Sequence, residues 1–263
     1  MTAKKTQKIG VLDSGVGGLT VVRAMQELLP GEDVIYFGDS ANVPYGNKTK
    51  AEILDLVNRI LDFMEDHEVK AIAIACNTIS TLYDEFAPGR KTKIFSIVEA
   101  GAGRVLEEGL PEVGLVGTDF TVKTGWYTKL IHEKDPSVRV YSAGNHMLAT
   151  ILDQGRFDEV PENLKNNLND LWKQGRPDHI ILGCTHYPIV RDQFEAEAPG
   201  VTFIDPAFEM AKNMKKWLEE NDLLRQKKTH HMDVFTSGDP QYYEQMCRRL
   251  KIRKPDSLNH REL

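Results

Sequence analysis

The stretch KAIAIACNT, residues 70–78, is followed 108 residues later by DHIILGCTHYP, residues 178–188. Each stretch is a short apolar run that leads to a cysteine and opens into a polar turn. Such a run predicts a buried parallel strand that enters a helix. Because the chain holds only 3 cysteines in 263 residues, two of them in the same local context indicate paired thiols, Cys76 and Cys184, that face one substrate.

The position of these thiols suggests chemistry. In open α/β sheets, ligands bind outside the carboxyl ends of the strands. A cysteine at that point also lies at the N-terminus of the next helix, where free N–H groups favour a thiolate over a thiol. A single free cysteine is more often a buried structural residue. The repetition favours the functional interpretation, and we predict that both thiols are activated.

The rest of the chain alternates predicted strands with predicted helices. Further strands are predicted at residues 9–13, 33–39, 93–99, 113–119, 138–144, 202–205 and 232–239, and helices at 19–29, 53–64, 163–172, 208–218 and 241–250. This alternation implies parallel crossover units. IGVLDS and VGLVGT lie 104 residues apart, so two halves keep nearly the same spacing from first strand to cysteine.

We therefore predict an α/β fold of two pseudo-symmetric three-layer domains with mostly parallel sheets and an active site in the cleft between them. The length of 263 residues allows two domains of ordinary size. Residues 1–97 and 208–263 are predicted to form an N-terminal domain that the C-terminal segment completes. Residues 98–207 are predicted to form the second domain.

Composition excludes several classes of function. Apolar residues at 41% and charged residues at 27% are typical of a globular protein, and a net charge of -6 predicts no general attraction to nucleic acid. No apolar stretch approaches the ~18 residues of a membrane span, and the start of the chain does not resemble a signal peptide. We expect a cytoplasmic protein without a membrane partner. The widely spaced cysteines and the adjacent His230 and His231 predict neither a disulfide framework nor a metal site.

Several polar residues next to the predicted strand ends are candidates for the site. The turn that begins with Asp13 and Ser14 is rich in glycine and suits an anion, but it lacks the spacing of nucleotide-binding loops. His186 could orient Cys184 or share its proton, or it could be an ordinary half-buried histidine. Asp39 could support the polar loop or take part in catalysis. The other candidates are Tyr45, Gly46, Asn77, Thr78 and Thr185.

At this point the sequence resembles a known family, the cofactor-independent aspartate/glutamate racemases, and within it the glutamate racemases. The resemblance rests on motifs that occur in order along nearly the whole chain: DSGVGGLTV (13–21), GD and VPYG (38–46), ACNT (75–78), GTDFTVKTGWY (117–127), GCTHYP (183–188) and FTSGDP (235–240). The pair ACNT and GCTHYP is the most specific of them.

The resemblance implies interconversion of L- and D-glutamate without pyridoxal phosphate, metal or other cofactor, which would supply D-glutamate for peptidoglycan. It implies that Cys76 and Cys184 are the two acid/base thiols on opposite faces of the substrate, with Asp13 and His186 as their respective helpers. It assigns substrate contact to Asp13, Ser14, Asn77, Thr78, Thr185 and His186, and it places Tyr45, Gly46, Thr118 and Thr121 in the pocket lining.

One segment departs from the family pattern, and some alternatives stay open. The chain reads GNHMLATILDQG at 144–155, with Asp153 where the family carries glutamate. The rival predictions are a racemase of aspartate or another acidic amino acid and a non-catalytic amino-acid-binding protein. A redox pair of cysteines would need the two Cα atoms within about 7 Å. Family members often form homodimers, but the composition does not decide the oligomeric state.

Overall fold

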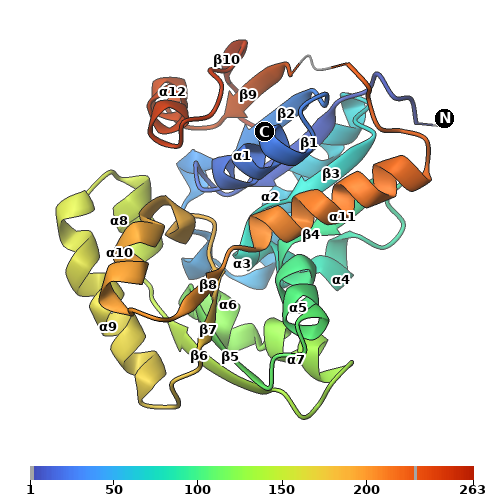
Figure 1. The fold of residues 1–263 in the computed structure, drawn as a ribbon. Helices are drawn as coiled ribbons and strands as arrows, with labels where there is room; N and C mark the ends of the chain where they lie inside the picture. Colours follow the sequence, from blue (N-terminus) through green and yellow to red (C-terminus); the bar gives the residue numbers. More distant parts are fainter. Residues whose placement is uncertain (1–2, 228–229) are drawn as a thin grey trace.

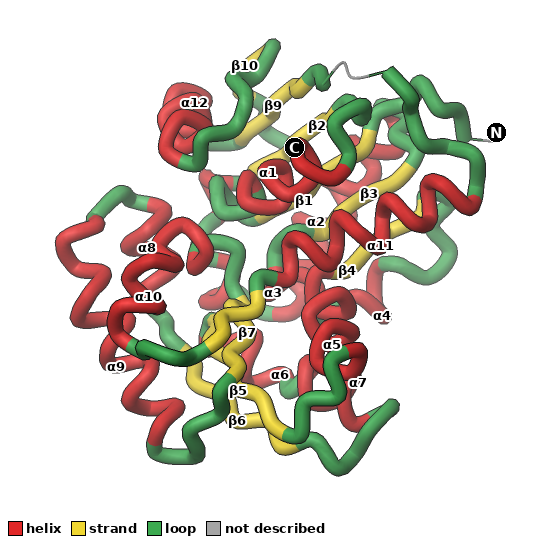
Figure 2. The backbone as a smooth tube through the Cα atoms, in the orientation of Figure 1, coloured by secondary structure: helices red, strands yellow, loops and turns green. Residues whose placement is uncertain are grey.

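The computed structural model describes residues 3–227 and 230–263 and contains two parallel β-sheets (Figure 1). One sheet lies in the upper half of the view and the other in the lower half, and helices flank both (Figure 2). Every strand pairing in the described residues is parallel. The predicted α/β class with parallel sheets is therefore confirmed.

The larger sheet has six strands in the order β10-β9-β2-β1-β3-β4. These are β1 (Ile9–Asp13), β2 (Val34–Gly38), β3 (Ala71–Ile74), β4 (Lys93–Ser96), β9 (Met232–Thr236) and β10 (Ser257–His260). Strands β1, β2 and β3 are buried along their whole length, which explains their almost uninterrupted apolar runs. The last two strands come from the C-terminal segment and extend this sheet at the β2 side.

The smaller sheet has four strands in the order β6-β5-β7-β8. These are β5 (Glu112–Gly117), β6 (Arg139–Gly144), β7 (His179–Gly183) and β8 (Thr202–Ile204). Its order repeats the order β2-β1-β3-β4 of the larger sheet, so the first strand of each unit lies between the second and the third. Cys76 follows β3 and Cys184 follows β7, so the two cysteines come after equivalent strands, as the repeat predicts.

Helices connect the strands and cover the sheets. The described α-helices are α1 (Leu19–Leu28), α2 (Lys50–Asp66), α3 (Asn77–Ser80), α4 (Tyr83–Phe86), α5 (Ile97–Glu107), α6 (Asp119–Thr124), α7 (Trp126–His132), α8 (Leu148–Asp153), α9 (Val160–Trp172), α10 (Arg191–Glu197), α11 (Pro206–Glu220) and α12 (Pro240–Arg249). Helix α2 shows how the sequence sets a boundary. The Thr49 hydroxyl accepts a hydrogen bond from the N–H of Glu52, and the N–H of Thr49 donates one to the Glu52 carboxylate, which forms a capping box.

Helices α5 and α11 pack against each other and contact both sheets. One continuous apolar core contains Val11 of the larger sheet, Leu115 of the smaller sheet and Met210 of α11. The halves are therefore joined by packed side chains as well as by the chain. The domain boundaries near residues 97 and 207 stay a prediction, since α5 and α11 belong to the packing of both halves.

Two predicted elements differ from the structure. The strand predicted at 93–99 ends at Ser96, because the hydroxyl of Ser96 accepts a hydrogen bond from the N–H of Glu99 and caps α5. The helix predicted at 241–250 is present as α12, but it does not close the chain, since β10 follows it. β10 lies at the edge of the sheet and is only partly buried, so its sequence carries little apolar signal.

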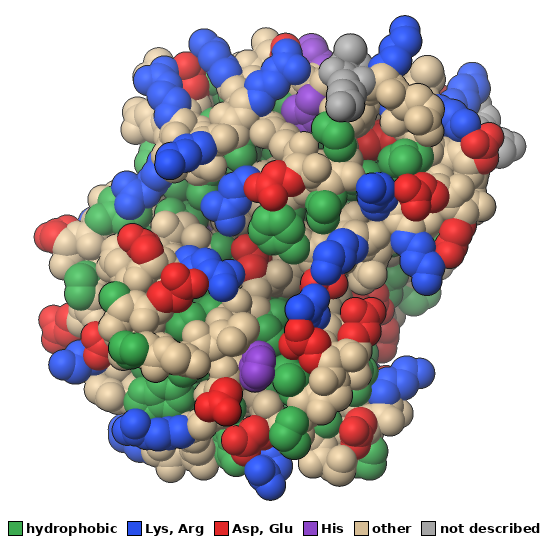
Figure 3. Space-filling model, viewed as in Figure 1, with side chains coloured by type: hydrophobic (Ala, Val, Ile, Leu, Met, Phe, Trp, Pro, Cys, Tyr) green, Lys and Arg blue, Asp and Glu red, His purple; other side chains and the backbone are tan. Residues whose placement is uncertain are grey.

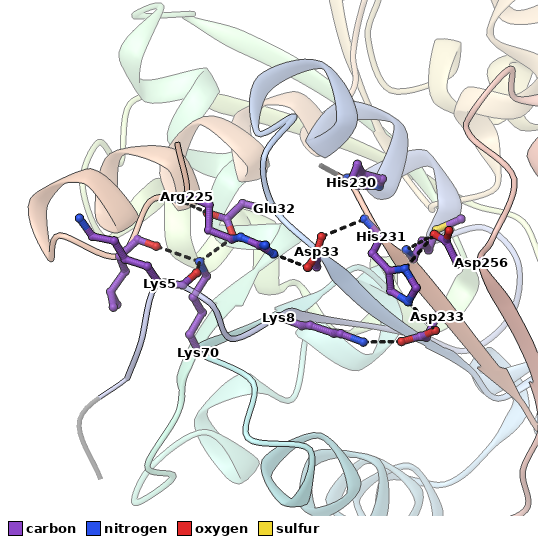
Figure 4. Close-up of polar contacts among 12 residues, drawn as sticks. Lys5, Lys8, Glu32, Asp33, Lys70, Arg225, His230, His231, Asp233 and Asp256 are labelled. Atoms are coloured by element: carbon purple, nitrogen blue, oxygen red, sulfur yellow. Dashed lines mark hydrogen bonds and ion pairs between the residues drawn. The ribbon is translucent and has the colours of Figure 1, made fainter. Parts of the chain in front are cut away.

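A charged network ties together the amino ends of the strands, at the edge of the larger sheet opposite the cysteines (Figure 4). The Lys70 ammonium is fully buried, lies 2.6 Å from the Glu32 carboxylate and also donates to the backbone oxygens of Lys5 and Leu223. Arg225 pairs with Asp33 in the same region. The charges of this network are paired with one another, and none of its residues lines the cavity at the opposite strand ends.

In the described residues, Leu263 is the one large hydrophobic side chain that is exposed. On the face in Figure 3, acidic and basic side chains are interspersed over both halves. No helix within residues 3–227 and 230–263 has the length and apolar character needed to cross a membrane.

Candidate active site

A cavity of about 360 Å³ lies at the carboxyl ends of the strands of both sheets. Its walls come from the turns after β1, β2, β3, β5 and β7 and from α8 with the residue that follows it. The lining residues are Ser14, Ser40, Val43, Pro44, Tyr45, Gly46, Cys76, Asn77, Thr78, Thr118, Ala149, Thr150, Asp153, Gln154, Cys184, Thr185 and His186. Cys76 and Cys184 therefore reach one cavity from different sheets.

Cys76 lies in a buried part of the cavity wall. Its side chain is buried, and its thiol donates to the Oγ of Ser14 over 3.6 Å. Burial, together with the negative charge of Asp13, raises the pKa of Cys76 to about 12. At neutral pH the Cys76 sulfur therefore carries a proton.

Cys184 has a different environment, because an imidazole lies beside it. The Cys184 Sγ is 3.8 Å from Nδ1 of His186, and Nε2 of His186 is 3.1 Å from Oδ1 of Asp153. Burial alone would lower the pKa of His186, but its contacts with Asp153 and Cys184 raise that pKa well above its ordinary value. A protonated imidazole therefore lies between a sulfur and a carboxylate.

Asp153, which stands where the family pattern has glutamate, belongs to the cavity. This aspartate lines the cavity, and its side chain is only 12% exposed where it meets His186. It also accepts from the N–H of Val16 over 3.4 Å. Although the family pattern has glutamate at this position, the shorter side chain reaches the imidazole.

Two of the residues selected from the sequence lie behind the cavity wall. Asp13 is fully buried and accepts hydrogen bonds from the Thr185 hydroxyl at 3.2 Å and the Gly15 N–H at 3.1 Å. Burial, offset in part by the positive charge of His186, raises its pKa to about 6. Thr121 is also fully buried and lies 2.9 Å from the Thr118 hydroxyl. Within the described residues, both support lining side chains rather than line the cavity themselves.

Hydroxyl and amide groups dominate the polar lining, and no lysine or arginine belongs to it among the described residues. Asn77 is 2% exposed, and its Oδ1 accepts a hydrogen bond of 2.7 Å from the Tyr127 hydroxyl. Its Nδ2 has no hydrogen-bond partner in the described part of the chain. A buried donor of this kind is costly unless a ligand binds it, so Asn77 is suited to an anionic group.

The predicted effect of helix ends on the thiols is only partly present. Helix α3, which begins after Cys76, has four residues, so it is a single turn, and burial outweighs it. Cys184 is followed by a 3-10 helix, Tyr187–Val190, rather than directly by an α-helix. The prediction that Cys76 is an activated thiol is wrong for this buried environment, because desolvation favours the neutral form.

The sequence did not point to several lining residues. Ser40, Val43 and Pro44 lie in the loop after β2, and Ala149, Thr150 and Gln154 lie on or next to α8. The sequence named Tyr45 and Gly46 of this loop as candidates, and the VPYG motif also contains Val43 and Pro44, so these two neighbours could have been included. Site residues were expected directly after the predicted strands. Helix α8 does not lie at such a point, so the alternating pattern of strands and helices does not predict its place in the site.

The glycine-rich turn after β1 packs closely against the side chains of Asp153 and His186. A Cβ at Gly15 would lie 2.6 Å from Oδ1 of Asp153, and one at Gly17 would lie 2.6 Å from Nδ1 of His186. Such contacts are too short for carbon, so any side chain here would displace a neighbour. The glycines in the turn therefore serve close packing of the backbone against His186 and Asp153.

We expect Gly17→Ala to lower a catalytic rate that depends on His186 by on the order of 100-fold, because its Cβ would displace the imidazole and displacement of a reacting group by about 1 Å has this effect. Steady-state kinetics would measure the loss. Gly103→Ala is the matched control, since a Cβ at Gly103 on α5 meets no atom within 4 Å. Equal losses in the two variants would show that the effect is not one of packing against His186.

A comparison with known families shows to which family the chain belongs. A family model described as Asp/Glu/Hydantoin racemase matches residues 9–213. The chain belongs to the Asp/Glu/hydantoin racemase family. The matched range includes both sheets' repeated units, both cysteines and Asp153. The resemblance and the racemase class predicted from the motifs are thereby confirmed.

Individual relatives of this racemase family member are similar over nearly their whole length. A glutamate racemase of Thermoanaerobacter pseudethanolicus is 34% identical over 259 residues, which cover 97% of each chain. A solved glutamate racemase isoform from Bacillus anthracis superposes with a TM-score of 0.89 at 29% identity, covering 96% of this chain and 97% of that one. The structure of the Francisella tularensis glutamate racemase in complex with D-glutamate gives a TM-score of 0.87 at 32% identity and covers 98% of both chains.

Proposed function

We propose that this racemase interconverts L- and D-glutamate by proton transfer between Cys76, the substrate α-carbon and Cys184. The observation that supports the proposal is the single cavity that both sulfurs line from different sheets. Inversion at one carbon needs a proton acceptor on one face and a proton donor on the other. A cavity of about 360 Å³ is large enough for a small amino acid.

The two thiols differ in a way that suits this reaction. The raised pKa of Cys76 keeps its proton in place, and Cys184 lies 3.8 Å from the imidazole of His186. We infer that Cys76 is the proton donor and that Cys184, as a thiolate, is the proton acceptor of the step described next. In the direction that starts from this protonation state, the Cys184 thiolate removes the α-proton and the Cys76 thiol delivers its proton to the opposite face. After one turnover the proton has moved from one sulfur to the other, and the reverse reaction restores it.

The α-carbanion is the difficult intermediate, because its charge spreads onto the substrate carboxylate. Donors placed in advance around that carboxylate would lower the barrier. The unpaired Nδ2 of Asn77 is the best candidate, and the Thr185 and Ser14 side chains lie in the same lining. Neutral donors of this kind hold a carboxylate without neutralising the Cys184 thiolate.

Glutamate is proposed over aspartate because relatives named glutamate racemase match nearly the whole chain. The product D-glutamate would then serve peptidoglycan synthesis, as the family resemblance implies. The homodimer is likewise a prediction that the single chain does not test.

The deciding experiment is incubation of each enantiomer of glutamate and aspartate with the protein in deuterated water. We expect loss of optical rotation and incorporation of one α-deuteron with both enantiomers of glutamate, and much slower change with aspartate. Faster exchange with aspartate would change the substrate, whereas binding without α-deuteration would support an amino-acid-binding protein instead.

A further inference from the structure

The loop that closes one side of the cavity is held by a carboxylate outside the cavity. Asp39 follows β2 and is 4% exposed. Its Oδ2 accepts a hydrogen bond of 2.6 Å from the Tyr45 hydroxyl, and its Oδ1 accepts from Ser237 Oγ at 2.6 Å and from Asn42 Nδ2 at 3.0 Å. Among the described residues no lysine or arginine pairs with Asp39, so these donors compensate its charge.

Tyr45 connects this carboxylate to the cavity. Its side chain is 2% exposed and belongs to the lining together with Val43, Pro44 and Gly46. Because the hydroxyl donates to Asp39, it is not free to donate to a substrate. Burial and the charge of Asp39 raise the pKa of Tyr45, so the phenol keeps the proton that makes this bond. Tyr45 thus forms part of the wall while Asp39 holds it.

The support for Asp39 comes from the C-terminal segment. Ser237 follows β9, donates to Asp39 and accepts a hydrogen bond of 3.0 Å from the N–H of Ala41. The neighbouring Gly238 packs so closely that a Cβ there would lie 2.7 Å from Cβ of Ser40. The loop after β2 is therefore fixed from behind by residues about 200 positions later in the chain.

The free side of the same loop reaches the smaller sheet. A Cβ at Gly46 would lie 3.5 Å from Cβ of Thr118, and the Thr118 hydroxyl is 3.0 Å from that of Thr78. Residues 43–46 therefore bridge the ends of β2 and β5 across the cavity. A loop released from Asp39 would leave this part of the wall unordered, and substrate binding would have to order it again.

We propose that Asp39 is a positioning residue for the racemase reaction, which holds residues 43–46 as a rigid wall of the substrate cavity through Tyr45. This inference rests on the proposed function. It assigns no proton transfer to Asp39, because the residue does not line the cavity. Loss of the Asp39 carboxylate is therefore expected to raise KM more than it lowers kcat.

The test is a comparison of KM with kcat in five variants, one of which is a control. We expect Asp39→Ala to raise KM for glutamate about 10- to 100-fold while kcat changes less than about 3-fold. Tyr45→Phe removes one oxygen and keeps the ring, so it folds and raises KM in the same direction by a smaller factor. Asp39→Asn, which keeps an acceptor for Tyr45, restores much of the affinity.

The double variant separates positioning from general stability. Asp39→Ala with Tyr45→Phe is expected to raise KM no more than Asp39→Ala alone, because both changes break one link. Asp205→Asn is the matched control, since Asp205 is a buried carboxylate that caps α11 outside the cavity lining. Its KM is expected to stay at the wild-type value.

Three results would overturn the role of Asp39: a wild-type KM in Asp39→Ala and Tyr45→Phe, additive effects in the double variant, or the same rise in Asp205→Asn. The wild-type protein is assayed first by α-deuteration of glutamate. Failure there removes the proposed function, whereas an active wild type with an unchanged KM in Asp39→Ala removes only the positioning role.

Discussion

Replacement of either cavity cysteine by serine is expected to lower the racemisation rate by about 10²- to 10⁴-fold, the usual contribution of a positioned general acid or base. A serine hydroxyl fits the space of the thiol but is a far weaker acid. Cys184→Ser removes the proposed proton acceptor beside His186, and Cys76→Ser removes the proposed proton donor on the other wall. Because inversion needs both groups, the double variant is expected to racemise glutamate at about the rate of the slower single variant.

The third cysteine provides the control. Cys247 is 1% exposed on α12 and lies outside the cavity lining, so Cys247→Ser keeps the proton-transfer groups intact. We expect near wild-type turnover from it, measured by polarimetry and by α-deuteration. If Cys76→Ser or Cys184→Ser also racemised glutamate at the wild-type rate, the two-thiol mechanism would be wrong.

The larger features of the fold could be predicted because they depend on local patterns. The buried strands β1, β3, β5 and β7 have apolar runs that end in polar turns, and these runs repeat along the chain. Within two residues after those strands come Ser14, Cys76, Thr118 and Cys184, all of which line the cavity. Parallel sheets bring strand ends together, so the sequence pattern was enough to find them.

Other features depend on contacts between distant segments. Helix α8 lines the cavity although it does not follow directly from a strand end. It is held from α12, where the Tyr242 hydroxyl donates to the backbone oxygen of Leu152, in the last turn of α8, over 3.1 Å. Helix α5 was missed because its sequence contains Gly101 and Gly103, which lower helix propensity, although packing against α11 stabilises it. In these places tertiary packing decides the structure, and local sequence does not reveal it.

Asp153→Asn is expected to lower kcat/KM by on the order of 100-fold at neutral pH, because the imidazole loses both its charged partner and its orientation. Asp153 contributes to the raised pKa of His186 through a hydrogen bond of 3.1 Å and its negative charge. Without that charge the pKa of His186 falls, so the imidazolium is lost at a lower pH. The alkaline limb of the kcat/KM profile should therefore move toward neutral pH.

Two further variants test whether the shift of the alkaline limb in Asp153→Asn is caused by the lower pKa of His186. Asp158→Asn removes an exposed carboxylate from the turn Phe157–Glu159, five positions after Asp153, and is expected to leave both the rate and the pH profile unchanged. Asp153→Glu restores the charge on a longer side chain, so the alkaline limb should return toward its wild-type position even if the rate does not recover fully. A profile that stays fixed in Asp153→Asn would contradict the role of the Asp153–His186 pair, since a loss of stability alone lowers the amount of active protein without moving the limb.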